Sequence, residues 1–353
     1  MNRNKPHNSA FLSAFSRRQV IISALKTSAL APFSGLFMST KVFASGGDNP
    51  ELKFHSDVYV WFPDGKVKNL TPMPGIYYQS CINLDGTHVL FSGNSSGSPR
   101  IWQADIQTGK ITSLTSDDHA ARHAVYSWLG DRIMFSSDQL SGQPPEQIKD
   151  MDSSGLPPEG HTVNLFSMDR DGKNVQQVTF GPFQDQRPCF SPDGKTAVFI
   201  SNRTGTPFTL WSVALDGRSE PSLLAEIKSN EINYVGHPAM RKDIIYRPWY
   251  STDGTKIFVF AHVNGRHQIC SVPADGGEIT PLANDDIGMS HGPFSDPDGK
   301  NLLMHSTRDG TWGIWELPLN GGEPRRLDPP GFETAGHATR SRNGIMAFDV
   351  VGR

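Results

Sequence analysis

One short pattern recurs six times along this chain: a tight turn built around glycine, followed directly by a run of β-branched and aromatic residues. The copies are LDGTHVLFSG (84–93), LGDRIMFSS (129–137), SPDGKTAVFIS (191–201), STDGTKIFVFA (251–261), DPDGKNLLMHS (296–306) and SRNGIMAFD (341–349). Each copy predicts a turn that leads into a β-strand. With the aspartate or its equivalent as marker, the copies fall at positions 85, 130, 193, 253, 298 and 343. The spacing is therefore 45 residues in three intervals, and 63 and 60 in the other two.

A second hairpin follows most of these copies. These hairpins are IWQADIQTGKITSLT (101–115), LFSMDRDGKNVQQVT (165–179), LWSVALDGRSEPSLL (210–224), ICSVPADGGEITPLA (269–283) and IWELPLNGGEPRRLD (314–328). Four strands in a period of about 45 residues indicate the blades of a β-propeller. The last copy has no second hairpin, and VYVWFPDGKVKNLT (58–71) is a second hairpin with no first one before it. We expect these two halves to combine into one blade.

We therefore predict an all-β fold, a β-propeller of six blades whose ring is closed by N-terminal strands that complete the last blade. Closure of this kind leaves no strand edge unpaired. A seventh blade within 225–245 is the alternative, although that stretch lacks the turn. The two longer intervals contain loops at 138–161 and 226–243. Such loops either contact substrate or tolerate variation, and the sequence favours neither interpretation.

The first 44 residues have the pattern of an export signal. Arg17 and Arg18 precede a modest apolar stretch from Val20 to Met38, and VFA (42–44) supplies small residues before a cleavage point at Ala44. This pattern predicts a twin-arginine signal peptide over 1–44, a short linker over 45–56 and a single propeller domain over 57–353. A membrane anchor is the alternative, but Lys26 and Pro32 interrupt the apolar run. We expect a periplasmic monomer that meets the export machinery and keeps no membrane contact after cleavage.

The net charge of the chain limits the kinds of molecule that it is expected to bind. The whole chain has 33 basic and 36 acidic residues, a formal charge of −3. The predicted signal contains six of the basic residues and no acidic one, so the mature chain has a charge of 27 − 36 = −9. This acidic balance argues against sequence-independent binding of nucleic acid, and an anionic ligand needs a locally basic pocket. Of the three cysteines, Cys81 and Cys189 stand at strand positions and are expected to be buried core residues.

Polar residues precede every turn at nearly the same distance. Seven and six residues before the markers stand Tyr78-Gln79, His123-Ala124, Gln186-Arg187, Tyr246-Arg247, His291-Gly292 and Gly336-His337. In a propeller the first strand of each blade lines the central channel, so these side chains are expected at one mouth of that channel. Polar lining of a wet channel is one explanation. Histidines, arginines and tyrosines gathered at one opening are also typical of a ligand site, and guanidinium groups suit carboxylates.

Two families resemble this chain. The Pro-Asp-Gly repeats resemble the propeller of the TolB family. A second resemblance, to oligogalacturonate lyases, rests on YYQSCINLDGTHVLFSG (77–93), on GHP (236–238) with YRP (246–248), and on SHGPF (290–294) and GHATRS (336–341). The last two stretches fall where that family places metal-binding histidines.

The likeness to the lyases implies a periplasmic enzyme that cleaves uronate-containing, oligogalacturonate-like oligosaccharides by β-elimination. Through the YRP match it implies that Arg247 acts as base or carboxylate clamp. Because the high pKa of arginine makes it an unusual base, His237 or His123 is the alternative base. Tyr78 and Tyr246 are the candidate proton donors. Substrate-binding candidates are Tyr78, Gln186, Arg187 and His262. Candidate ligands for a divalent metal, Mn or Ca, are His291, His337 and Gln79.

The likeness to TolB implies the alternative, a non-catalytic propeller that binds a protein or peptide partner. The lyases also differ from this chain in two respects, the first being that they have seven blades whereas this chain counts six. Phe332 and Ala335 stand where a glutamine and a histidine of the lyase metal site are expected, so Gln79 is the substitute ligand.

Overall fold

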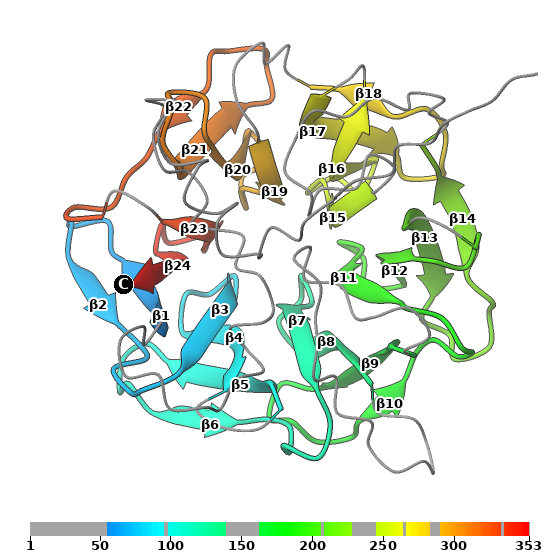
Figure 1. Ribbon diagram of the computed structural model, residues 1–353, viewed down its shortest axis with the longest axis horizontal. Helices are drawn as coiled ribbons and strands as arrows, with labels where there is room; N and C mark the ends of the chain where they lie inside the picture. Colours follow the sequence, from blue (N-terminus) through cyan, green and yellow to red (C-terminus); the bar gives the residue numbers. More distant parts are fainter. Residues whose placement is uncertain are drawn as a thin grey trace, which may run out of the picture. The chain divides into compact units, whose positions relative to one another are not determined.

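Every regular element that the structure describes is a β-strand (Figure 1). The computed structural model describes residues 55–94, 98–138, 162–205, 208–227, 245–263, 266–282, 290–332 and 335–352, all within the unit Ser39–Arg353. In these ranges we find no helix long and apolar enough to cross a membrane. The predicted signal peptide, its cleavage point, and nearly all of the loops 138–161 and 226–243 lie outside the described residues.

Four sheets contain four consecutive strands each, as the repeat predicts. One sheet is β7 (Ala121–Tyr126), β8 (Arg132–Ser137), β9 (Asn164–Asp169) and β10 (Gln176–Gln177). The next is β11 (Gln186–Phe190), β12 (Thr196–Ser201), β13 (Thr209–Ala214) and β14 (Ser222–Ala225). The other two are β15 (Ile245–Tyr250), β16 (Lys256–Val263), β17 (Arg266–Pro273) and β18 (Thr280–Pro281), and β19 (Ser290–Ser295), β20 (Asn301–Ser306), β21 (Gly313–Pro318) and β22 (Arg325–Arg326).

The remaining eight strands form a single sheet, which differs from the prediction of separate blades. It contains β23 (Gly336–Arg340), β24 (Met346–Gly352), β1 (His55–Trp61) and β2 (Val67–Asn69), followed by β3 (Ile76–Ile82), β4 (His88–Asn94), β5 (Arg100–Asp105) and β6 (Ile111–Ser113). The two sets of four merge because Ser56 of β1 bridges Ile76 of β3 in a single parallel pair. β1 is antiparallel to β24 over seven residue pairs, so strands from the two ends of the propeller region lie side by side, as expected.

The arrangement is that of an all-β propeller. The first strands β3, β7, β11, β15, β19 and β23 lie innermost, and each contacts the next, including β23 with β3 (Figure 1). The second strands are buried on both faces because neighbouring sets of four strands pack on either side. In β4, Leu90 packs with residues of β7 and β8, whereas Val89 and Phe91 pack with Val58 of β1. This explains why the second strands read as continuous apolar runs rather than alternating ones.

The repeated turn has the same geometry in all six copies. The glycine donates its amide hydrogen to the carbonyl oxygen three residues earlier, at 2.9–3.0 Å, with φ between 70° and 81°. Those glycines are Gly86, Gly130, Gly194, Gly254, Gly299 and Gly344. Since Gly130 occupies the glycine position of its turn, the residue equivalent to aspartate in that copy is Leu129. The predicted marker at 130 is therefore wrong by one residue, and six residues before the corrected marker stands His123.

The three cysteines are unpaired and buried, as predicted for Cys81 and Cys189. Burial raises the pKa of Cys81 to about 11 and that of Cys189 to about 12, so both remain thiols at neutral pH.

The pairing of β1 with β24 predicts a large effect of Phe348→Ala. Phe348 is fully buried, with its ring 5.6 Å from that of Tyr59 of β1 and 5.3 Å from that of Phe332. Removing such a side chain should lower the free energy of unfolding in urea by about 3–5 kcal/mol. Phe180→Ala is the control, because Phe180 is 62% exposed, and it should change stability by no more than about 0.5 kcal/mol. Equal stability of the two variants would contradict this packing.

Candidate functional site

Each innermost strand contains a bulge at the same position. The pairing register with the second strand shifts between Tyr78 and Cys81 in β3, and at the equivalent place in the other five. The first of the two residues inside each shift has left-handed backbone: Gln79 (φ 58°), His123 (59°), Arg187 (54°), Arg247 (51°), Gly292 (59°) and His337 (47°). This backbone costs a non-glycine residue roughly 1 kcal/mol or more. Five non-glycine residues with this strained backbone at one repeated position indicate a functional constraint.

In three copies a side chain from the preceding set of strands holds the left-handed amide. Ser92 of β4 accepts a hydrogen bond from the backbone N–H of His123 at 3.1 Å. Ser136 of β8 accepts one from Arg187 at 3.2 Å, and Asp349 of β24 accepts one from Gln79 at 2.7 Å. The strain at these residues is therefore offset by contacts between neighbouring sets of four strands.

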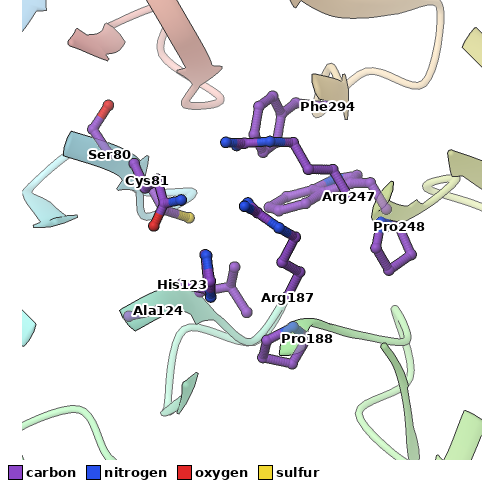
Figure 2. A pocket seen from close by; sticks show the side chains of 12 residues that line it. Ser80, Cys81, His123, Ala124, Arg187, Pro188, Arg247, Pro248 and Phe294 are labelled. Carbon is purple, nitrogen blue, oxygen red and sulfur yellow. The ribbon is translucent and has the colours of Figure 1, made fainter. Parts of the chain in front are cut away.

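Four of the left-handed residues line one pocket at the centre, which encloses about 430 Å³ including space open to solvent. They are Gln79, His123, Arg187 and Arg247, contributed by four different sheets. Figure 2 shows the guanidinium groups of Arg187 and Arg247 side by side, both directed toward the centre, with His123 close to Arg187.

The two arginines have little compensation for their charge. Arg187 donates from Nη2 to the Tyr246 hydroxyl, and its guanidinium carbon lies 3.9 Å from the centre of the Tyr246 ring. Nε of Arg187 and Nε of Arg247 are buried, and neither has a hydrogen-bond partner among the described residues. Within the same ranges no carboxylate forms an ion pair with either guanidinium group. An isolated buried cation is unfavourable, and a bound anion would relieve it.

The burial of these groups and their closeness to one another change their pKa values. Burial lowers the pKa of Arg247 to about 9, and the positive charge of Arg187 acts in the same direction against Tyr246 and Asp349. Burial also lowers the pKa of Arg187. The pKa of His123 is held well below its ordinary value, first by burial and then by the charges of Arg187 and Arg247. His123 is therefore a neutral imidazole at neutral pH, and neither ring nitrogen has a hydrogen-bond partner among the described residues.

His337 and Asp349 form a pair beside these groups. Nδ1 of His337 lies 3.0 Å from Oδ1 and 2.8 Å from Oδ2 of Asp349. Burial lowers the pKa of His337, and the charge of Arg247 adds to this effect. Burial alone would raise the pKa of Asp349, but His337, the Gln79 amide and Arg247 outweigh it and hold the pKa below its usual range. Asp349 is therefore ionised at neutral pH.

One wall of the pocket is apolar. Trp249 and Phe294 meet edge to face with their ring centres 4.8 Å apart, and Pro188 and Pro248 continue the wall. Nε1 of Trp249 is buried and has no hydrogen-bond partner in the described part of the chain. A ligand with an anionic group and a flat apolar face fits this combination.

The structure brings together part of the predicted site. Arg187, Arg247, His123 and Gln79 share the pocket, and Tyr246 is joined to Arg187. Gln186, which precedes Arg187 in the chain, is buried, and Tyr78 is half-buried. Neither residue is among those that line the pocket. His237 lies outside the described residues. His262 and His291 belong to β16 and β19, but their side chains are not among those described.

Sequence reasoning missed Asp349, Trp249 and Phe294. A signal for Asp349 was present, because SRNGIMAFD (341–349) has a carboxylate directly after its buried Phe348, where LDGTHVLFSG (84–93) and LGDRIMFSS (129–137) have serine after the equivalent phenylalanine. Trp249 and Phe294 each lie two residues after a left-handed position, a relation that only the bulge makes visible.

The described residues do not fit a divalent metal. No group of three histidine, cysteine, aspartate or glutamate side chains within reach of one ion occurs among them. Of the predicted ligands, His337 is bound to Asp349, and Gln79 contributes a buried Oε1 without a described partner. The positive charge of Arg247 and Arg187 acts on His337 and opposes a second cation there. The donor set points to an anion instead.

Comparisons with known proteins agree with the fold. No protein-family model matches the chain. An uncharacterized protein of Agrobacterium fabrum is 24% identical over 262 residues, which cover 68% of this chain and 80% of that protein. A TolB homolog of Chlorobium chlorochromatii is 29% identical over 168 residues, covering 48% of this chain but only 32% of the homolog. The match thus spans about a third of that TolB homolog.

Solved structures are similar at low identity. A protein of Agrobacterium tumefaciens assigned to TolB superposes with a TM-score of 0.59 at 16% identity, covering 85% of this chain and 99% of that one. An oligogalacturonate lyase in complex with manganese has a TM-score of 0.51 at 16% identity, covering 83% and 77%. The chain is therefore a β-propeller like those of TolB and oligogalacturonate lyase.

The lowered pKa of His123 predicts that acid destabilises the fold. In the unfolded chain this imidazole binds a proton near its ordinary pKa of 6.5, whereas the folded protein resists protonation. Around and below that pH the unfolded state binds more protons, so the free energy of unfolding should fall as the pH drops through about 6.5 toward the lowered pKa of the folded imidazole. Urea unfolding at several pH values measures this, and His123→Gln should flatten part of the dependence. Protonation of His123 near pH 6.5 in an NMR titration of the folded protein would contradict the prediction.

Proposed function

We propose that this chain is a carbon–oxygen lyase that binds the carboxylate of a uronate-containing oligosaccharide in the central pocket and cleaves the chain by β-elimination. The observation that carries the proposal is the pair of guanidinium groups, Arg187 and Arg247, beside a neutral imidazole, His123, with no carboxylate of the described residues paired to either arginine. Such a pocket is prepared for a small anion and contains a base.

The arginines supply the first requirement of the reaction. Elimination removes the proton next to the uronate carboxylate, and that proton becomes acidic only when the carboxylate charge is neutralised. A guanidinium group binds a carboxylate through two parallel hydrogen bonds, and two such groups occupy this pocket. The burial that lowers the pKa of Arg247 to about 9 also strengthens its attraction for an anion.

The imidazole supplies the second requirement. A general base must be unprotonated at the working pH, and the lowered pKa of His123 keeps it so. We assign the base to His123, Arg247 to the carboxylate clamp, and the proton donor for the departing oxygen to Tyr246. Trp249 and Phe294 give the sugar ring an apolar surface. No step is assigned to a metal, because the described residues do not make up a ligand set for one.

The wider organisation is also a proposal. We count the two halves of the eight-stranded sheet as two blades, which makes six in all, with the ring closed where β1 completes the set begun by β23 and β24. We propose that residues 1–44 direct export to the periplasm and that residues 57–353 form one domain, with β1 beginning slightly earlier at His55. We propose a monomer.

A binding propeller without catalysis is the second candidate. The matches to TolB homologs, 26% and 29% identical over 145 and 168 residues, favour it. The two candidates differ in the fate of the ligand: a binding propeller leaves an oligouronate intact, whereas a lyase converts it to an unsaturated product that absorbs in the ultraviolet. Incubation with a panel of galacturonate- and glucuronate-containing oligosaccharides separates them, and no rise in absorbance across the panel would refute the lyase.

Arg247→Gln should abolish most turnover. Removing the carboxylate clamp should lower kcat/KM on the best uronate of the panel by about a hundredfold or more. The fold should survive, because the variant removes a buried and poorly compensated charge. Arg170→Gln is the matched control, since Arg170 is bonded to Asp85 and Thr87 and is not among the pocket residues. Equal turnover of Arg247→Gln and wild type would contradict the assignment.

A further inference from the structure

Asp349 holds two central residues from different strands at once. Its carboxylate accepts the backbone N–H of Gln79 in β3 at 2.7 Å, and it lies 2.8–3.0 Å from Nδ1 of His337 in β23. Both Gln79 and His337 are left-handed bulge residues. Asp349 itself is only 7% exposed.

Two other copies of the repeat have serine at the position equivalent to Asp349. In their pairings, Ser92 lies opposite Tyr78, Ser136 opposite Arg122, and Asp349 opposite Gly336, which in each case is the residue just before the left-handed one. The two serines hold only the left-handed amide of the next innermost strand. Asp349 does the same for Gln79 and in addition reaches the imidazole of its own sheet.

The chemistry of the pair determines the tautomer of His337. An ionised carboxylate can only accept hydrogen bonds, so Nδ1 of His337 must carry the proton. In the neutral ring Nε2 is then the acceptor. A serine at this position would still accept the Gln79 amide, but its neutral hydroxyl can donate as well as accept, so it would not require a proton on Nδ1 of the imidazole.

We propose that Asp349 is a positioning residue that fixes two neighbouring members of the central ring together: it keeps His337 in the Nδ1-protonated tautomer and it holds the left-handed bulge that places Gln79 in the pocket. Through Gln79, whose buried Oε1 has no hydrogen-bond partner in the described ranges, Asp349 shapes the side of the pocket contributed by β3. Any effect on ligand affinity rests on the proposed function, whereas the tautomer and the bulge do not.

Loss of this carboxylate should not unfold the protein. β3 and β23 are also joined by Ser80 Oγ, which donates to the carbonyl of His337 at 3.5 Å, and by the Ile82 amide, which donates to Thr339 Oγ1 at 2.9 Å. Asp349→Ser copies the arrangement that the chain already uses at Ser92 and Ser136. Ser136→Ala is the matched control, because it removes the support of the Arg187 bulge without touching His337.

The test is the nitrogen chemical shifts of the His337 ring in protein labelled with ¹⁵N at histidine, with His337→Gln to assign the signals. In the wild-type protein at neutral pH we expect Nδ1 protonated and Nε2 bare. In Asp349→Ser we expect a shift toward the Nε2-protonated form, with hydrogen exchange of the Gln79 amide unchanged, and in Ser136→Ala the wild-type tautomer. An Nε2-protonated ring in the wild type overturns the proposal without any variant, as does an unchanged ring in Asp349→Ser.

A second, independent test measures ligand binding by calorimetry, with galacturonic acid as the probe. Asp349→Ala removes both contacts, and we expect it to weaken binding by about tenfold, the effect of one lost hydrogen bond in a buried site. Faster exchange of the Gln79 amide in this variant supports the second half of the proposal, and unchanged exchange overturns it. If the wild type itself does not bind galacturonic acid, the proposed function fails, while the tautomer and exchange measurements still decide the role of Asp349.

Discussion

The left-handed bulge in each innermost strand is the constraint on which the site depends. In a regular strand successive side chains alternate between the two faces of the sheet, and in a propeller both faces are covered by neighbouring sheets. One extra residue with positive φ breaks this alternation and gives a side chain access to the centre. Glycine would adopt this backbone without strain, yet only Gly292 does so, and the other five positions have glutamine, histidine or arginine. The backbone of the innermost strands is therefore strained at the positions that have polar side chains at the centre.

The side chains at these positions form an environment suited to an anion. Arg187 and Arg247 approach the centre from adjacent sheets, and the low exposure of the site weakens the screening of their charges. Burial, together with the charges of the two arginines, lowers the pKa of His123 and keeps it neutral, so a neutral imidazole and two cations coexist at neutral pH. Asp349 is ionised nearby, but its oxygens are taken by His337 and the Gln79 amide rather than by an arginine. The site is therefore polarised, with unmatched positive charge on the side of β11 and β15.

The sequence predicted the architecture better than the site. The turn repeat identified the strands because a glycine with positive φ and a buried apolar strand both leave local patterns. The copy at 129–137 was misplaced by one residue, since its glycine precedes the aspartate instead of following it, and this shift obscured that His123 is equivalent to Arg187 and Arg247. The bridge between Ser56 and Ile76 and the contact of Asp349 with Gln79 join residues distant in the chain, so no local pattern reports them. Residues such as Tyr78 and Gln186 share the polar character of the site residues, and only the bulge decides which of two neighbours reaches the pocket.

We propose that Arg187 and Arg247 together form a carboxylate site. The most direct measurement is calorimetric titration of galacturonic acid into the wild-type protein and into the double variant Arg187→Gln/Arg247→Gln, at low and at moderate salt. We expect one site per chain in the wild-type protein, with affinity weakened by salt, and no measurable binding to the double variant. Equal binding by both proteins, or no binding by the wild type at low salt, would contradict this proposal.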